Sequence, residues 1–187
     1  TPYGKKAKMS INDSALTITK ADSLLVLLSG GTNYSTETAN YRTNESVLHQ
    51  RIDDIINKAL AKNYTTLKTR QQKSHRMLFD RCQLSITPDD CNTKPTPQLV
   101  ADYNKTDSSY LDNHFLEELY FNYGRYLLIS CAQGIALPSN LQGIWNYSNS
   151  AVWHCDIHAN INVQMNYWPA EVTNLSELHN NLLDYIY

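Results

Sequence analysis

The pattern of apolar and polar positions divides the chain into an N-terminal stretch of short strands and a longer, mainly helical remainder. Runs rich in Ile, Leu, Val and Thr alternate with turn residues such as Asn12-Asp13-Ser14, a pattern typical of a β-hairpin or meander. These runs cover residues 8–10, 15–19 and 24–28. Residues 32–46 show no apolar periodicity, so we expect a linker or surface loop there.

Helical spacing begins near Val47. Apolar positions from there to Leu67, and a second run around Leu78, predict two connecting helices. Residues 85–110 carry three prolines among polar residues and predict an irregular crossing segment.

The C-terminal part predicts further helices joined by long loops. A broad apolar face predicts a long helix over residues 112–129, and the Gly- and Asn-rich residues 131–151 predict a loop. Residues 163–168 begin another helix, which Pro169 should end or kink, and residues 175–187 supply the next.

Composition narrows the classes of protein. The 187 residues carry a net charge of −2, with 42% hydrophobic and 18% charged residues, which argues against disorder and gives no electrostatic reason to bind nucleic acid. The longest apolar runs are far shorter than the roughly 20 residues that cross a bilayer, so we expect no membrane span. The chain starts without Met and stops inside a predicted helix, so we expect a fragment of a longer protein.

The four cysteines are irregularly spaced and form no zinc-finger pattern, so no metal site is predicted. A disulfide between Cys82 and Cys91 and two free thiols are both open possibilities. Signatures of a nucleophile elbow, a phosphate-binding loop, a dinucleotide fold and a zinc protease are all missing from the sequence.

The segment richest in chemistry is residues 153–171, where Asn residues stand among Ile, Val, Met and Trp. An amide buried without a partner costs about 1–3 kcal/mol, so such residues need a structural or functional reason. His158, Asn160 and Asn162 are spaced by two, and an extended backbone would direct all three side chains the same way. We therefore expect residues 158–162 to approach the next helix in extended form.

A structural and a functional interpretation of this segment both remain open. Asn residues beside loops commonly cap helices, whereas Trp145, Trp153 and Trp168 provide aromatic faces that suit sugar rings and could equally belong to the core. Asp156 is a site carboxylate, a helix cap or a partner that fixes the tautomer of a histidine.

Three ordered blocks, residues 119–130, 137–146 and 158–171, together resemble the glycoside hydrolases of family 95, whose best-known activity is 1,2-α-L-fucosidase. Residues 76–81 and 24–34 resemble that family more weakly. The resemblance implies a mainly α chain with a short N-terminal β segment: a partial (α/α)6 barrel preceded by the last strands of a β-sandwich and by linker helices. The implied boundaries are 1–46 for the β domain, 47–108 for the linker and 109–187 for the start of the barrel.

The resemblance also implies an inverting hydrolase with no cofactor. Asn160 and Asn162 would position the attacking water, His158 would contact the sugar, and we expect Trp153 and Trp168 to bind substrate as well. The general acid Glu and the base Asp are expected beyond Tyr187. The implied partner is a fucosylated oligosaccharide or glycan, and the implied location is secreted or periplasmic.

Other functions remain alternatives at this point. An α-L-galactosidase of the same family differs only in the hydroxyl at C6 of the sugar, and a non-catalytic carbohydrate-binding protein on the same barrel would lack the two carboxylates. A helical protein-interaction module would leave the Asn160 and Asn162 pair unexplained.

Overall fold

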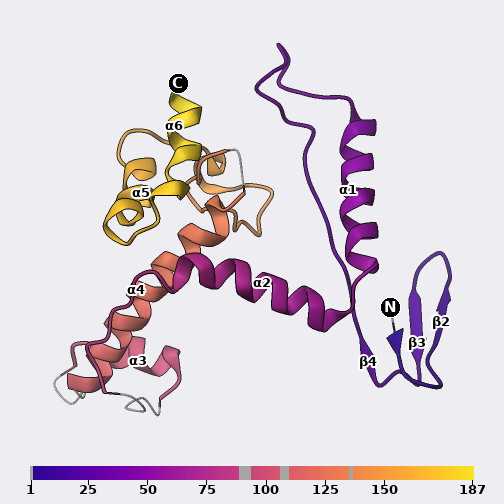
Figure 1. Ribbon diagram of the computed structural model, residues 1–187, viewed down its shortest axis with the longest axis horizontal. Coiled ribbons are helices and arrows are strands. Elements are labelled where there is room, and N and C mark those ends of the chain that lie inside the picture. The colour runs from indigo at the N-terminus through magenta and orange to yellow at the C-terminus, as the bar shows by residue number, and fades with distance from the viewer. Residues whose placement is uncertain (1, 89–93, 106–109, 135–136) are drawn as a thin grey trace. The chain divides into compact units, whose positions relative to one another are not determined.

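The computed structural model describes residues 2–88, 94–105, 110–134 and 137–187 (Figure 1). It is mainly helical with a few short strands near the N-terminus, which confirms the predicted class at that level. The chain divides into two compact units, Thr1–Gln72 and Lys73–Tyr187, and each is described by itself. Cys91 lies outside the described residues, so the disulfide considered for Cys82 is not described either.

The first unit opens with two small antiparallel pairs of strands. β2 (Lys8–Ile11) pairs with β3 (Leu16–Thr19), and β1 (Pro2–Tyr3) pairs with β4 (Ser23–Leu24). The Asn12 side chain closes the hairpin, because its Oδ1 accepts hydrogen bonds from the backbone N–H groups of Ser14 and Ala15. The predicted hairpin is confirmed.

The predicted strand over residues 24–28 is wrong beyond Leu24. Residues 26–28 belong to no strand of the described sheets, and an apolar run forms a ladder only where a partner strand supplies its hydrogen bonds.

Two helices follow the strands, as predicted, but the first ends at Leu60, before the predicted apolar spacing ends at Leu67. α1 (Glu45–Leu60) begins at Asn44, whose Oδ1 accepts from the Ser46 N–H at 2.9 Å. α2 (Tyr64–Phe79) begins after Asn63, whose Oδ1 accepts from the Thr66 N–H at 2.8 Å. Asn63 is a strong N-cap residue, and this local signal outweighs the apolar spacing that continues to Leu67.

The second unit contains the remaining elements. They are α3 (Thr96–Asp102), α4 (Tyr110–Ala132), the 3₁₀ helix η1 (Val152–Cys155), α5 (Asn162–Val172), the 3₁₀ helix η2 (Ser176–Leu178) and α6 (Asn180–Ile186). The long helix predicted over residues 112–129 is confirmed as α4. The predicted C-terminal helix is divided into η2 and α6.

Two predictions in this unit are corrected. The crossing segment contains the short helix α3, with Pro97 in its first turn, where the missing N–H of proline removes no helical hydrogen bond. Of the two outcomes predicted for Pro169, an end of the helix is wrong, because α5 continues to Val172, whereas a kink stays a prediction. The loss at Pro169 is limited to one backbone donor, and the proline carbonyl still accepts from both the N–H and the hydroxyl of Thr173.

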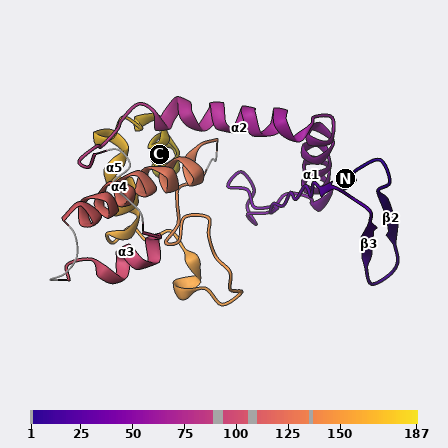
Figure 2. The ribbon, with the colours of Figure 1, turned by 90° about the horizontal axis from the view of Figure 1, so that it is seen from below.

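The core of the second unit lies between α4, α5 and the C-terminal helices (Figure 2). Its buried members are Leu78, Leu128, Ile129, Ala132, Val163, Tyr167, Ala170, Leu175, Leu178 and Leu182. Full burial of one such apolar side chain stabilises a fold by about 1.5–3 kcal/mol. None of the helices in the described parts of the chain is long and apolar enough to cross a membrane.

Candidate functional site

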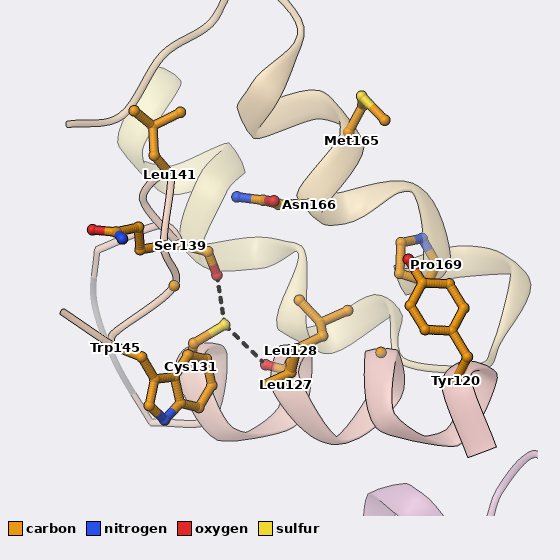
Figure 3. Close-up of a pocket in the computed structure, with 13 residues that line it drawn as sticks. Tyr120, Leu127, Leu128, Cys131, Ser139, Leu141, Trp145, Met165, Asn166 and Pro169 are labelled. Atoms are coloured by element: carbon orange, nitrogen blue, oxygen red, sulfur yellow. Dashed lines mark hydrogen bonds between the residues drawn. The ribbon is translucent and has the colours of Figure 1, made fainter. Parts of the chain in front are cut away.

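A hollow of about 450 Å³ opens in the second unit between α4, the loop 139–145 and α5 (Figure 3). α4 contributes one face to it, because positions 120, 124, 127, 128 and 131 recur at helical spacing. Most of the lining is apolar or aromatic. The residues that line it are Tyr120, Gly124, Leu127, Leu128, Cys131, Ser139, Leu141, Gln142, Gly143, Trp145, Met165, Asn166 and Pro169.

Buried hydrogen bonds fix the loop that forms one wall of the hollow. The Tyr167 hydroxyl accepts from the Ser139 N–H at 3.0 Å and donates to Asn181 Oδ1 at 2.8 Å. The Asn181 amide in turn donates to the Leu137 carbonyl at 3.1 Å. Tyr167, Ser139 and Asn181 are each less than a tenth exposed, so these bonds are shielded from competing water.

Two further side chains bind the same loop from the neighbouring helices. Asn166 of α5 donates from Nδ2 to the Asn140 carbonyl at 2.9 Å. Cys131 of α4 lies with its Sγ 2.7 Å from the Ser139 hydroxyl (Figure 3). Burial raises the pKa of the Cys131 thiol, so it stays protonated at neutral pH and acts as a structural group and not as a nucleophile.

Trp145 takes its place in the hollow because residue 143 is glycine. Gly143 has a φ of +66°, and a Cβ built there would lie 2.6 Å from Cζ3 of the Trp145 ring. Any larger residue would strain the backbone and push the indole away. Trp145 remains 42% exposed, so part of its surface is accessible to a ligand.

Residues 155 and 156, which precede the predicted site residues, are hydrogen-bonded to the loop 139–145. The Leu141 N–H donates to the Asp156 carbonyl at 3.1 Å, and Cys155 Sγ donates to Asn140 Oδ1 at 3.3 Å. Trp153, His154 and Cys155 have φ values of 47°, 56° and 58°. Three consecutive non-glycine residues in the left-handed region store backbone strain, and such strain is concentrated at functional sites.

The expectation of an extended backbone over residues 158–162 is wrong. Residues 159–161 form a turn, and Asn162 is the first residue of α5. The Val163 N–H donates to the His158 carbonyl at 2.9 Å, and the Gln164 side chain donates to the Ala159 carbonyl at 2.6 Å. Since α5 has no side-chain N-cap, this turn supplies the partners that the first helical turn needs.

The five predicted site residues are solvent-accessible, and none of them lines the hollow. Asn160 is exposed and Asn162 half-buried, and within the described residues neither side-chain amide is hydrogen-bonded. His158 Nε2 lies 3.9 Å from Asp156 Oδ2, a distance that permits an ion pair when the imidazole is protonated. Trp153 and Trp168 are 68% and 60% exposed, so neither is a core residue in this unit.

Sequence reasoning alone did not identify the role of Arg125, the largest fully buried side chain. Its Nη1 donates to the Phe79 and Cys82 carbonyls at 2.6 and 2.8 Å, and its Nη2 to Leu78 and Thr173 at 3.2 and 3.4 Å. Burial lowers the pKa of the guanidinium. A cation among carbonyls at the C-terminal ends of α2 and α5 also complements both helix dipoles.

The only signal for this role was an arginine within an apolar stretch of the predicted long helix. In the parts of the chain that the structure describes, no three His, Cys, Asp or Glu side chains gather to hold a metal ion. The hollow itself is lined by apolar side chains, aromatic rings, two amides and the Cys131 and Ser139 side chains, and Asp156 is hydrogen-bonded to its loop wall.

Comparison with known protein families identifies the family to which this chain belongs. The profile of the glycosyl hydrolase family 95 catalytic domain matches residues 63–187. The chain belongs to glycoside hydrolase family 95. The family 95 match covers all of the second unit, including α4, the hollow and the turn before α5.

Curated relatives agree with this family 95 assignment. The chain is 33% identical over 168 residues to "Probable alpha-fucosidase A" of Aspergillus niger, covering 87% of this chain and 21% of the relative. It is 33% identical over 180 residues to the protein of the same name from Aspergillus oryzae, at 92% and 24% coverage. It is 30% identical over 178 residues to "Alpha-L-fucosidase 2" of Arabidopsis thaliana, at 95% and 21% coverage. The chain thus spans between a fifth and a quarter of the length of these relatives.

Proposed function

We propose that the protein containing this chain is an inverting glycoside hydrolase that removes terminal α-1,2-linked L-fucosyl residues from oligosaccharides and glycans. The observation that carries the proposal is the match of residues 63–187 to the family 95 catalytic domain. The names of the Aspergillus and Arabidopsis relatives support fucose as the sugar.

In this proposal Asn160 and Asn162 orient the attacking water. A side-chain amide has no useful basicity, but its carbonyl oxygen accepts a hydrogen bond from water and so directs a lone pair toward the anomeric carbon. Two features support the role: both amides are accessible and free of hydrogen bonds within the described residues, and Asn162 begins a helix whose next residue, Val163, is buried in the core. Both amides are thus available, and that of Asn162 is held by a helix.

The proton transfers are assigned to two carboxyl groups that we place beyond Tyr187. Inversion requires a general acid and a general base about 6.5–9.5 Å apart, with room for water on the face opposite the leaving group. His158 contacts the sugar in this proposal, and the exposed rings of Trp153 and Trp168 bind it through their faces.

The boundaries 1–46, 47–108 and 109–187 are proposed as domain limits of the parent protein.

The test uses the protein at the length of its relatives, with 2′-fucosyllactose as substrate and nuclear magnetic resonance to identify the first anomer released. We expect β-L-fucose from the α-linked substrate. Asn162→Ala should lower kcat about 10²–10³-fold, since a positioned water is lost from the transition state. Asn180→Ala, an exposed amide at the start of α6, is the matched control and should retain activity.

Other results would contradict specific parts of the proposal. Release of α-L-fucose would exclude inversion, and faster turnover of an α-L-galactoside would replace fucose as the preferred sugar. Binding of the glycan without turnover would make the protein a carbohydrate-binding member of the family. The 187-residue chain by itself should show no turnover, because each missing acid or base is worth about 10²–10⁴-fold.

A further inference from the structure

The hollow adjoins the turn that carries the proposed catalytic amides. Asn162 and Asn166 are four residues apart in α5, so they lie on the same face of the helix, separated by about 6 Å along its axis. Asn166 lines the hollow, whereas Asn162 does not. The loop wall is also hydrogen-bonded to residues 155 and 156, which lead directly into His158. The hollow therefore begins about one sugar unit away from Asn162.

The chemistry of the lining favours a neutral ligand with one apolar face. Of the 13 described residues that line it, none is Asp, Glu, Lys, Arg or His. Trp145 and Tyr120 contribute aromatic rings, and Met165, another lining residue, is half exposed. A charged ligand would find no counter-ion here, and a glycosidic bond would find no carboxyl group to cleave it.

The hollow also offers unpaired amide groups that can bind the hydroxyls of an uncharged sugar. Asn166 donates its Nδ2 to the loop, which leaves its Oδ1 without a hydrogen bond among the described residues. The Gln142 side chain is exposed and equally unpaired within that part of the chain. A pyranose offers C–H groups to an aromatic face and hydroxyls to amides, and the volume of about 450 Å³ lies in the range of small-molecule sites.

We infer that this hollow is the subsite for the sugar that bears the fucosyl residue, that is, the leaving-group sugar, and that Trp145 is its stacking platform. The inference rests on the proposed function for the position of the bond that is cleaved. The buried Tyr167, Ser139 and Asn181 hydrogen bonds then hold the loop that carries the platform, and Gly143 leaves room for the indole.

The experiment compares two substrates that share the fucosyl residue but differ in the leaving group. 2′-Fucosyllactose carries a galactose that the hollow would bind, whereas α-L-fucosyl fluoride carries no second sugar. In the protein at the length of its relatives, Trp145→Ala should lower kcat/KM for 2′-fucosyllactose about tenfold, mainly through KM, and leave the fluoride within twofold of wild type. Trp145→Phe should restore most of the loss, because it keeps an aromatic face.

Tyr147→Ala is the matched control, since Tyr147 is fully exposed two residues further on and does not line the hollow. It should leave both substrates unchanged. An equal loss on both substrates after Trp145→Ala, or no loss on either, would overturn the inference. So would a Trp145→Phe variant as impaired on 2′-fucosyllactose as the alanine variant.

A binding measurement separates this inference from the proposed function. If the wild-type protein hydrolyses neither substrate, the proposed function fails, and lactose alone becomes the probe. Isothermal titration should then show that lactose binds wild type about tenfold more tightly than Trp145→Ala. Absence of lactose binding, or equal binding by both proteins, would overturn the subsite.

Discussion

The two units of the chain are stabilised in different ways. None of the described residues in the first unit is buried, and Ile11 and Val26 are each about three-quarters exposed. Its hairpin and its helix starts depend on local hydrogen bonds that backbone N–H groups donate to asparagine side chains. The second unit holds the buried core and the buried polar network. Local bonds define the elements of the first unit, whereas long-range packing defines the second.

This contrast can be measured in the 187-residue chain, because its three tryptophans all belong to the second unit. Tryptophan fluorescence therefore reports unfolding of that unit, and far-ultraviolet circular dichroism reports helices in both. A substitution in the second unit should shift both signals, and one in the first unit should leave the fluorescence transition in place.

The largest effect is expected for Arg125→Met, which removes a buried cation from four carbonyls. Buried carbonyls left unpaired each cost about 1–3 kcal/mol, so the free energy of unfolding should fall by about 3–5 kcal/mol in urea denaturation followed by fluorescence. Arg76→Met, at an exposed position of α2, is the control and should change it by less than about 0.5 kcal/mol. Similar losses in both variants would show that the carbonyl contacts contribute little.

An intermediate effect is expected for Tyr167→Phe. The ring and its packing are kept, but the Ser139 N–H and Asn181 Oδ1 lose their shared partner, so the same measurement should show a loss of about 1–2 kcal/mol. Tyr147→Phe is the control, because that side chain is fully exposed. An unchanged unfolding midpoint for Tyr167→Phe would mean that water replaces the hydroxyl at no cost.

The smallest effect is expected for Ile11→Ala, since this side chain is 74% exposed. The free energy of unfolding, followed by far-ultraviolet circular dichroism because fluorescence reports only the second unit, should change by less than about 0.5 kcal/mol. The same substitution at Ile129, which is 1% exposed, should cost about 2–5 kcal/mol and gives the direct comparison between the units. Equal losses at the two positions would show that Ile11 is covered in solution.

Much of the fold was predictable where the signal is local. The β2–β3 hairpin follows from turn residues, and α4 follows from a broad apolar face. Predictions failed where partners decide the conformation. Residues 26–28 look like a strand but belong to none of the described sheets. The alternation of His158, Asn160 and Asn162 looks extended, but residues 159–161 form a turn that satisfies the start of α5.

The family could be identified from the same residues, because three ordered motifs are a specific pattern and the profile match covers them. The hollow could not be predicted, since it depends on contacts between residues that are far apart in sequence. Asn166 and Asn140, for example, are 26 positions apart, and the Tyr167 hydroxyl reaches Ser139 across 28. No periodicity encodes such pairs.

The position of Arg125 in the chain has a consequence for synthesis. Its carbonyl partners lie on both sides of it, with Leu78 47 residues before and Thr173 48 residues after. A ribosome that adds about 5–20 residues per second delivers the second partner roughly 2–10 s after the arginine. During that interval the guanidinium can bind only the carbonyls at the end of α2. The nascent chain thus completes this cluster in two steps, and the later one waits for α5 to emerge.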